Sequence, residues 1–226
     1  RGVTEVVTPG VAIDDKLLDH KANNYLASLA FGKKSRFGLA LLDVSTGEFL
    51  VSEGSAAYID KLLQSFSPSE IIFGKGYAKA FHEHYGDKFY TFPLDDWIYT
   101  EDYTREKLLE YFQVQSLKGF GVEELDLAQV AAGAVLHYLA TTENKHLQRL
   151  TSINRIQADR YVWLDRFTIR NLELIHSPHP SGVPLIDILA ATLSPMGARL
   201  LKKWVVLPLK DRSRVEARLE MVSHFL

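Results

Sequence analysis

Three acidic side chains are the strongest candidates for chemistry in this sequence. Asp43 ends an apolar run, Glu70 begins another, and Asp96 follows a third. Carboxylates that gather at strand ends can hold two Mg²⁺ ions, which activate water and stabilise the leaving oxygen of a phosphodiester. A metal-dependent nuclease, or a nucleotide-binding protein that uses Asp43 to organise Mg²⁺, is therefore one hypothesis for the function.

The surroundings of Asp43 favour a structural role instead. The expected first strand, residues 25–31, contains no acid and carries Ser28 near its middle, so a carboxylate that a nuclease needs there is missing. Asp43 is followed by Ser45 and Gly47, a pattern typical of an aspartate that accepts N–H groups two residues further on. We therefore expect Asp43 to hold a turn, and the nuclease remains the alternative.

Basic residues cluster near the end of the sequence. They are Lys202, Lys203, Lys210, Arg212, Arg214 and Arg218. Of these, Lys202, Lys203, Arg212 and Arg214 are the candidates for contacts with DNA phosphates, which lysine and arginine neutralise. Acidic residues are interspersed at positions 211, 216 and 220, so a solvated helix face is the competing interpretation.

Other residues that can do chemistry receive structural interpretations. The aromatic side chains near the expected helices are assigned to core packing rather than to base stacking. They are Tyr161, Trp163, Phe167 and Trp204. His82 and His84 are two residues apart, which on a helix directs them to different sides rather than to one metal ion.

Composition excludes several classes of function. The 226 residues carry 26 Lys and Arg against 28 Asp and Glu, so a net charge of −2 gives no general attraction to DNA or to anionic membranes. There is no cysteine, which excludes disulfides, thiolate zinc sites and cysteine nucleophiles. The sequence shows neither an apolar run long enough to span a membrane nor a signal peptide, and a cytoplasmic location is expected.

The elements expected in residues 1–150 alternate between strands and helices. Residues 25–31, 37–44 and 48–52 predict a three-stranded antiparallel meander. Helices are expected at 57–66, 77–85, 104–112 with Thr104 as cap, and 124–142, and strands at 70–73 and 88–92. A meander followed by alternating helices and strands is typical of the α/β ribonuclease H-like fold, a mixed sheet with helices on both faces.

Residues 151–226 predict a different, mainly α-helical unit. Ser194 is a good N-cap with Pro195 at the first helical position, and Pro208 ends that helix. Asp211 can cap a last helix. The polar stretch 141–151 is the expected junction between the two units.

Several segments together resemble the MutS family of DNA mismatch repair proteins. They are VVTPG (6–10), FGLA (37–40), DVSTGEF (43–49), GFGVE (119–123), RNLEL (170–174) and TLSPMGARLL (192–201). The resemblance implies that residues 1–10 are the tail of the mismatch-recognition domain, 11–150 the ribonuclease H-like connector domain, and 151–226 the start of the helical lever, or core, domain.

The resemblance also implies a function for the parent protein. A MutS dimer encircles DNA, binds mismatches, uses ATP and Mg²⁺, and recruits MutL. The mismatch wedge is expected before Arg1 and the ATPase beyond Leu226, so we expect this fragment to be a non-catalytic connector and lever module with no catalytic, cofactor or metal residue. Arg170, Asn171, Glu173 and Arg199 are family-typical positions with an expected structural or transmission role.

Overall fold

The chain folds into two compact units. The computed structural model describes residues 8–11, 22–142, 150–162, 164 and 166–225. The first unit includes residues 23–156 together with the segment 8–11, and the second includes residues 157–226. The predicted junction falls mostly on residues 143–149, outside the described residues, so a domain boundary at 150 stays a prediction.

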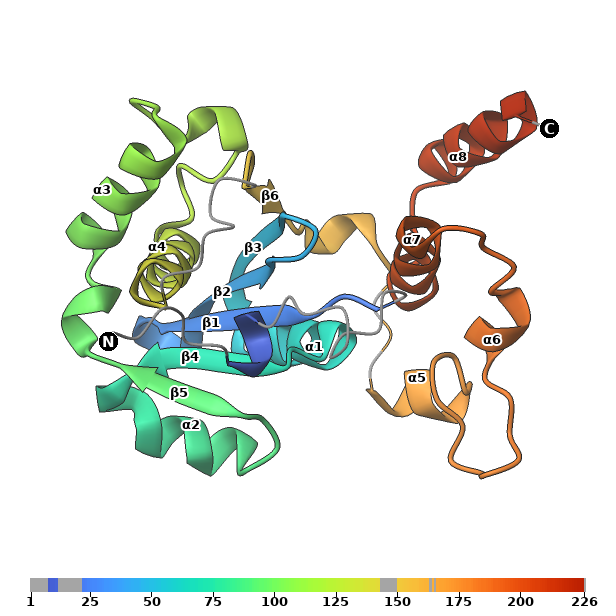
Figure 1. Ribbon diagram of the computed structural model, residues 1–226, viewed down its shortest axis with the longest axis horizontal. Helices are drawn as coiled ribbons and strands as arrows, with labels where there is room; N and C mark the ends of the chain where they lie inside the picture. The colour runs from blue at the N-terminus through green and yellow to red at the C-terminus, as the bar shows by residue number, and fades with distance from the viewer. Residues whose placement is uncertain (1–7, 12–21, 143–149, 163, 165, 226) are drawn as a thin grey trace, which may run out of the picture. The chain divides into compact units, whose positions relative to one another are not determined.

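The first unit is built on a mixed sheet, as the sequence predicts (Figure 1). Strands β1 (Tyr25–Phe31), β2 (Arg36–Asp43) and β3 (Glu48–Ser55) form the expected antiparallel meander. Three further strands run parallel to their neighbours, and the order across the sheet is β5-β4-β1-β2-β3-β6. They are β4 (Glu70–Gly74), β5 (Thr91–Leu94) and β6 (Asn154–Arg155).

Helices cover both faces of this sheet (Figure 1). They are α1 (Ala56–Phe66), α2 (Ala78–Tyr85), α3 (Glu101–Phe112) and α4 (Asp126–Thr141). Side chains alternate along β1, so that Leu26 and Ala30 join the core beneath α4 while Ala27 and Leu29 point to the opposite face. All four are buried, which explains why the sequence of β1 is almost continuously apolar.

Three elements of the first unit differ from the prediction by three residues at one end, and the first of them is β3, which runs to Ser55 rather than to residue 52. The strand expected at 88–92 is β5, which begins at Thr91 and passes through Pro93, because this strand lies at the edge of the sheet, where proline is tolerated. The helix expected to begin at Thr104 is α3, which begins at Glu101, where the acidic residues 101 and 102 suit the positive end of the helix. Thr104 lies inside the helix, and its hydroxyl donates to the Thr100 carbonyl at 2.8 Å.

The second unit is mainly helical, as predicted. Its helices are α5 (Arg166–Asn171), α6 (Leu185–Leu189), α7 (Pro195–Val206) and α8 (Arg212–Phe225). The Ser194 hydroxyl accepts the Gly197 N–H at 3.1 Å, and Asp211 accepts the Arg214 N–H at 3.0 Å, so both predicted caps are confirmed.

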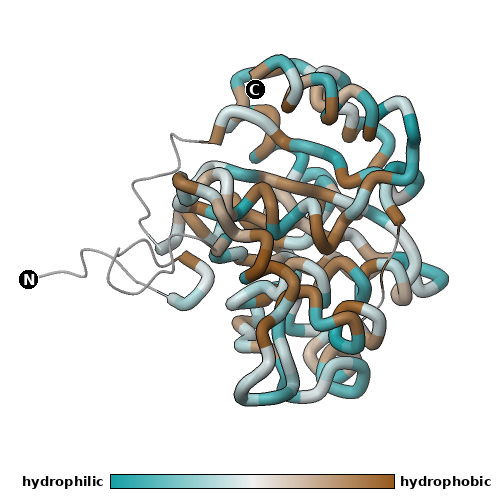
Figure 2. Tube along the Cα trace, turned by 90° about the vertical axis from the view of Figure 1, so that its right-hand side faces the viewer, coloured by the Kyte–Doolittle hydropathy of each residue, from teal (hydrophilic) through white to brown (hydrophobic). Residues whose placement is uncertain are grey.

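The prediction that the aromatic residues of this unit pack in a core is only partly correct. Phe167 is 74% exposed, so its assignment to the core is wrong. Trp204 is half-buried, and the Arg218 guanidinium lies 4.2 Å from its ring centre. Trp163 lies outside the described residues. Figure 2 shows brown and teal alternating along α8, the helix that ends beside the C-terminal label, and Leu219 and Val222 on that helix are exposed.

Among the described helices, none combines the length and the apolar character needed to cross a membrane.

Candidate functional site

Asp43 ends β2 and holds the turn that leads into β3. Its Oδ1 accepts the Ser45 N–H at 2.9 Å, the Ser45 hydroxyl at 2.6 Å and the Thr46 N–H at 3.3 Å. Its Oδ2 accepts the Asn23 side-chain amide at 2.6 Å. Gly47 completes the turn with a φ of 74°, which glycine adopts without strain. The predicted role of Asp43 is therefore confirmed, and both of its oxygens are engaged by donors of the protein.

Glu70 begins β4 and is fully buried. Its Oε2 accepts the Thr8 hydroxyl at 2.5 Å and the Gly10 N–H at 2.9 Å, and its Oε1 accepts the Tyr138 hydroxyl at 2.7 Å. Burial raises the pKa of the Tyr138 hydroxyl, and the hydrogen bond to Glu70 adds to that rise. The phenol therefore keeps its proton and donates a hydrogen bond to the carboxylate.

Asp96 lies at the other end of the sheet from these two carboxylates. The register places Asp43 beside Tyr25 and Glu70 beside Leu26, at the start of β1. Asp96 accepts the Gly76 N–H at 2.8 Å, just beyond the carboxyl end of β4. At about 3.3 Å per strand residue, roughly 13 Å of strand separates the two ends. Asp43, Glu70 and Asp96, the three candidate carboxylates, therefore do not converge on one ion.

Within the part of the chain that the structure describes, no group of three or more His, Asp or Glu side chains is arranged to hold a metal ion. His82 contacts Asp87 at 3.5 Å and His84 contacts Asp60 at 2.9 Å, so the two rings have different partners, as their spacing on a helix predicts.

A groove of about 1030 Å³ lies at the carboxyl ends of β1 and β4. Its lining includes two basic residues, Lys33 and Lys34, and three acidic ones, Asp96, Glu101 and Asp126. Sequence reasoning missed this groove, because its walls come from segments far apart in the chain. The glycines that follow β1 and end β4, at positions 32 and 74, were the available signal, since crevices in α/β sheets form at the carboxyl ends of strands.

Three of the charged groups that line this groove, Arg36, Glu53 and Asp96, are engaged with the protein. Glu53 accepts the N–H groups of Leu127 at 3.0 Å and Ala128 at 3.4 Å, and it pairs with Arg36 at 2.6 Å. It thereby occupies the positive N-terminal end of α4 that an anionic ligand would need. Tyr99 also lines the groove, its hydroxyl lies 3.1 Å from the Ser28 hydroxyl, and burial raises the pKa of Tyr99.

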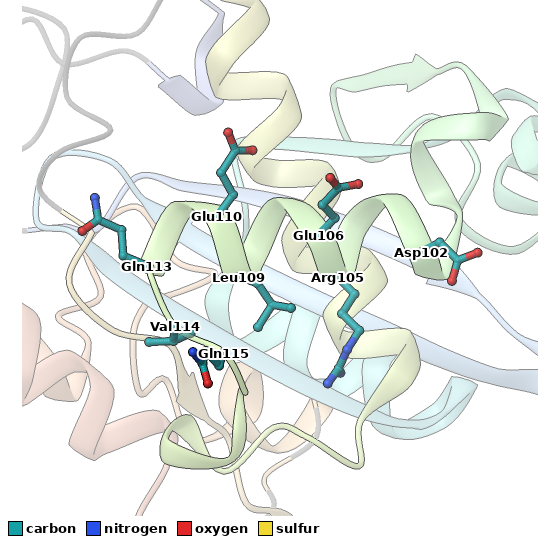
Figure 3. Close-up of a pocket in the computed structure, with 8 residues that line it drawn as sticks. All are labelled: Asp102, Arg105, Glu106, Leu109, Glu110, Gln113, Val114 and Gln115. Carbon is teal, nitrogen blue, oxygen red and sulfur yellow. The ribbon is translucent and has the colours of Figure 1, made fainter.

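A second, shallower hollow of about 550 Å³ follows the outer side of α3 (Figure 3). Figure 3 shows Glu106 and Glu110 pointing to one side of the helix and Arg105 and Leu109 to the other. The Arg105 guanidinium donates to the carboxylate of Glu123 and, at 2.9 Å, to the side-chain oxygen of Gln129. Its charge is thus used to fix α3 to the segment that precedes α4.

The structure places the DNA-phosphate candidates on two helices of the second unit. Lys202 and Lys203 lie in α7 and are half-buried, and Arg212 and Arg214 lie in α8 and are exposed. Arg212 pairs with Glu216 at 2.7 Å, one turn along the same helix. A role in DNA binding stays a prediction for all four.

The family-typical residues of the RNLEL segment line one hollow of the second unit. Arg170 and Asn171 end α5, and Glu173 follows in a left-handed conformation with a φ of 48°. All three line a hollow of about 430 Å³, together with Phe167 and Pro178. The Glu173 carbonyl accepts the Leu185 N–H at 2.8 Å, which ties this segment to α6. Arg199, the fourth such position, lies in α7.

Comparisons with known proteins match both units to the same family. Residues 24–152 match the family model of MutS domain II, and residues 167–226 match that of MutS domain III. The chain is 56% identical to the DNA mismatch repair protein MutS of Flavobacterium psychrophilum over its whole length. It is 55% identical to that of Cytophaga hutchinsonii over 99% of the chain and 52% identical to that of Bacteroides fragilis over all of it. In each case it spans 26% of the relative, about a quarter of its length.

Proposed function

The chain belongs to the MutS family of DNA mismatch repair proteins, and we propose that it acts there as a non-catalytic module for interdomain transmission and MutL contact. In this proposal residues 1–10 are the tail of the mismatch-recognition domain, 11–150 the connector domain and 151–226 the start of the lever domain. ATP and Mg²⁺ belong to other parts of the parent protein. Mismatched DNA and the dimer partner meet this module through the parent, which we place in the cytoplasm.

The commitment of the carboxylates carries the non-catalytic part of the proposal. Asp43 uses its lone pairs to bind Asn23 and the turn from Ser45 to Thr46, and Glu70 uses its own to bind neutral donors in its buried surroundings. A carboxylate must present free oxygens to an ion or to water to do metal or acid-base chemistry. A fold that can carry nuclease sites therefore serves here as a scaffold, since function depends on the site and not on the fold.

Transmission needs contacts that differ between the functional states of the parent. A module between two sites couples them only if it bonds differently in each state. The division of the chain into two structured units supports this role.

Binding of this chain to MutL tests the proposal directly. We expect saturable binding in a label-free equilibrium measurement at moderate salt. Two charge reversals at exposed glutamates, Glu106→Arg on α3 and Glu83→Arg on α2, form a matched pair, because each changes one face of the sheet. The affinities of the two variants for MutL are compared with that of the unchanged chain. Absence of binding, under conditions in which the full-length protein binds, would overturn the docking role.

Nuclease activity is the alternative, and it has its own test. Mg²⁺-dependent cleavage of DNA by this chain that disappears in Asp43→Asn would overturn the non-catalytic proposal. A Mg²⁺ or ATP site would also stabilise the fold, by about 2.7 kcal/mol at a ligand concentration 100 times the dissociation constant. We expect an unchanged melting temperature with either ligand.

A further inference from the structure

Glu70 is a buried carboxylate to which the proposed function assigns no task. Its three donors come from two separate parts of the chain, since Thr8 and Gly10 belong to the segment 8–11 and Tyr138 belongs to the last third of α4. A buried charge must be compensated by hydrogen bonds, and bonds to a charged acceptor are stronger than those between neutral groups. Glu70 therefore has a stronger hold on both parts than a neutral side chain would have.

The Thr8 hydroxyl, the Tyr138 hydroxyl and the Glu70 carboxylate each contact the other two. The Thr8 and Tyr138 oxygens lie 3.2 Å apart, and each lies within 2.7 Å of a Glu70 oxygen. An ionised carboxylate only accepts, so both hydroxyls donate to Glu70, and the Tyr138 hydroxyl also donates to the Thr8 oxygen over the longer distance. Displacement of one hydroxyl thus changes the geometry available to the other through the carboxylate.

The backbone at Gly10 fits closely against the same side chain. A Cβ at this position would lie 2.8 Å from the Glu70 Cβ and 3.1 Å from the Leu26 Cβ, so only glycine allows this approach. The Asn24 side-chain amide donates to the Pro9 carbonyl at 2.8 Å, and the Val11 N–H donates to the Thr8 carbonyl at 3.1 Å. The segment 8–11 is therefore held at several points, with Glu70 as the buried one.

We propose that Glu70 is a positioning residue that couples the segment 8–11 to α4, so that displacement of either is transmitted to the other through its carboxylate. The coupling rests on the contacts within the first unit and does not depend on MutL contact. It goes beyond the proposed function by naming one residue through which motion of the chain ahead of the sheet reaches the helix that covers it.

A double-mutant cycle measures this coupling. Thr8→Val and Tyr138→Phe each remove one hydroxyl and leave the size of the side chain nearly unchanged. The readout is amide hydrogen exchange at Gly10, whose N–H donates to Glu70, and at Thr142, whose N–H donates to the Tyr138 carbonyl at 3.0 Å. We expect Tyr138→Phe to speed Gly10 exchange about tenfold, as the loss of one bond to a charged group predicts, and Thr8→Val to speed Thr142 exchange.

The two variants must be non-additive if Glu70 couples them. Additive effects, or a Gly10 exchange rate that Tyr138→Phe leaves unchanged, would overturn the proposal. Tyr85→Phe is the matched control, because Tyr85 is a buried tyrosine of α2 whose hydroxyl donates to the Asp60 carboxylate at 2.5 Å. It should leave Gly10 exchange unchanged, and an equal acceleration in this control would show a merely global effect and overturn the proposal.

Glu70→Gln gives a second measurement that is independent of the cycle. It preserves the size of the side chain and replaces one acceptor oxygen by a donor. We expect Gly10 exchange to accelerate about tenfold or more, and an unchanged rate would contradict the proposal. MutL binding by the same variants separates this coupling from the docking role, since either can fail while the other holds.

Discussion

Gly133 of α4 lies directly against Thr104 of α3. A Cβ on the glycine would lie 2.4 Å from the Thr104 Cβ and 2.7 Å from its carbonyl oxygen, distances that real side chains do not reach. The absent side chain therefore sets how closely the two helices on this face of the sheet approach each other.

Replacement of this glycine should separate α3 from α4. We expect Gly133→Ala to destabilise the first unit by about 1–3 kcal/mol in urea unfolding, since the overpacking cost exceeds the gain of roughly 1 kcal/mol in helix propensity. Gly119→Ala is the control, because a Cβ there would meet nothing within 4 Å. Equal stability of the two variants would show that the helices do not depend on this contact.

Asp43 and Asn23 should tolerate an exchange of their roles. Asp43→Asn keeps one oxygen for the turn but directs its amide at the Asn23 amide, and we expect a destabilisation of about 1–3 kcal/mol from the unsatisfied donors. Adding Asn23→Asp restores an acceptor for that amide, so the double variant should recover most of this stability. A double variant no more stable than Asp43→Asn alone would show that this pair contributes little.

Glu123 should make the stability of the first unit depend on acidic pH. The hydrogen bond from Arg105 lowers the pKa of Glu123 below its ordinary value of 4.5, and the Leu117 N–H contributes in the same direction. A lowered carboxyl pKa stabilises the fold above the unfolded value, and this contribution is lost as the pH falls through the folded value. Wild type should therefore exceed Glu123→Gln in stability at pH 7, and the difference should vanish in strong acid.

His137 should titrate below its ordinary range. Its ring lies edge-on to Trp97 and contacts the Tyr103 hydroxyl at 2.6 Å. Burial lowers its pKa from 6.5, and Lys107 lowers it further. Neutral His137 is thus favoured by folding, so its contribution to stability is present above pH 6.5 and declines as the pH falls. An NMR titration should give a midpoint below 6.5 that rises in Trp97→Ala but not in Trp204→Ala.

DNA binding by the parent protein tests the basic candidates of the second unit. If Lys202, Lys203, Arg212 and Arg214 bind phosphates, glutamine at all four should lower the affinity equally for matched and mismatched duplexes. The logarithm of the affinity falls linearly with the logarithm of the salt concentration, and this slope should become shallower by about 0.9 for each phosphate that is no longer neutralised. Glutamine at Lys75 and Lys79 of the first unit is the control, and an unchanged slope in the fourfold variant would leave these residues as a solvated face.

The elements that could be predicted from the sequence carry local, redundant signals. The meander follows from three apolar runs divided by turn residues, and α7 from a capping serine followed by proline. The start of α3 could not be placed because Thr104 looks like a cap in isolation, whereas its hydroxyl satisfies a carbonyl within the helix. The short helix α6, 185–189, has no apolar period long enough to detect.

Only part of the candidate site could be predicted, because some of its contacts are local in the sequence and others are not. The turn role of Asp43 was predictable, because its main acceptor contacts lie two and three residues away. The partners of Glu70 lie 62 and 68 residues away at Thr8 and Tyr138, and the two N–H groups that donate to Glu53 lie in α4, so only the folded chain brings them together. Nothing in the sequence distinguishes a buried glutamate from a solvated one in advance.

Pro93 removes a backbone hydrogen-bond donor from the outer edge of the sheet. The Tyr90 carbonyl accepts the Ile71 N–H, so the alternate residues of β5, Thr91 and Pro93, turn their backbone groups away from β4. Pro93 has no N–H to offer there, and the exposed edge therefore lacks the regular ladder of donors that a foreign strand would need. The sheet is thereby protected against growing from one molecule into the next, and crowded chains are kept from polymerising through this edge.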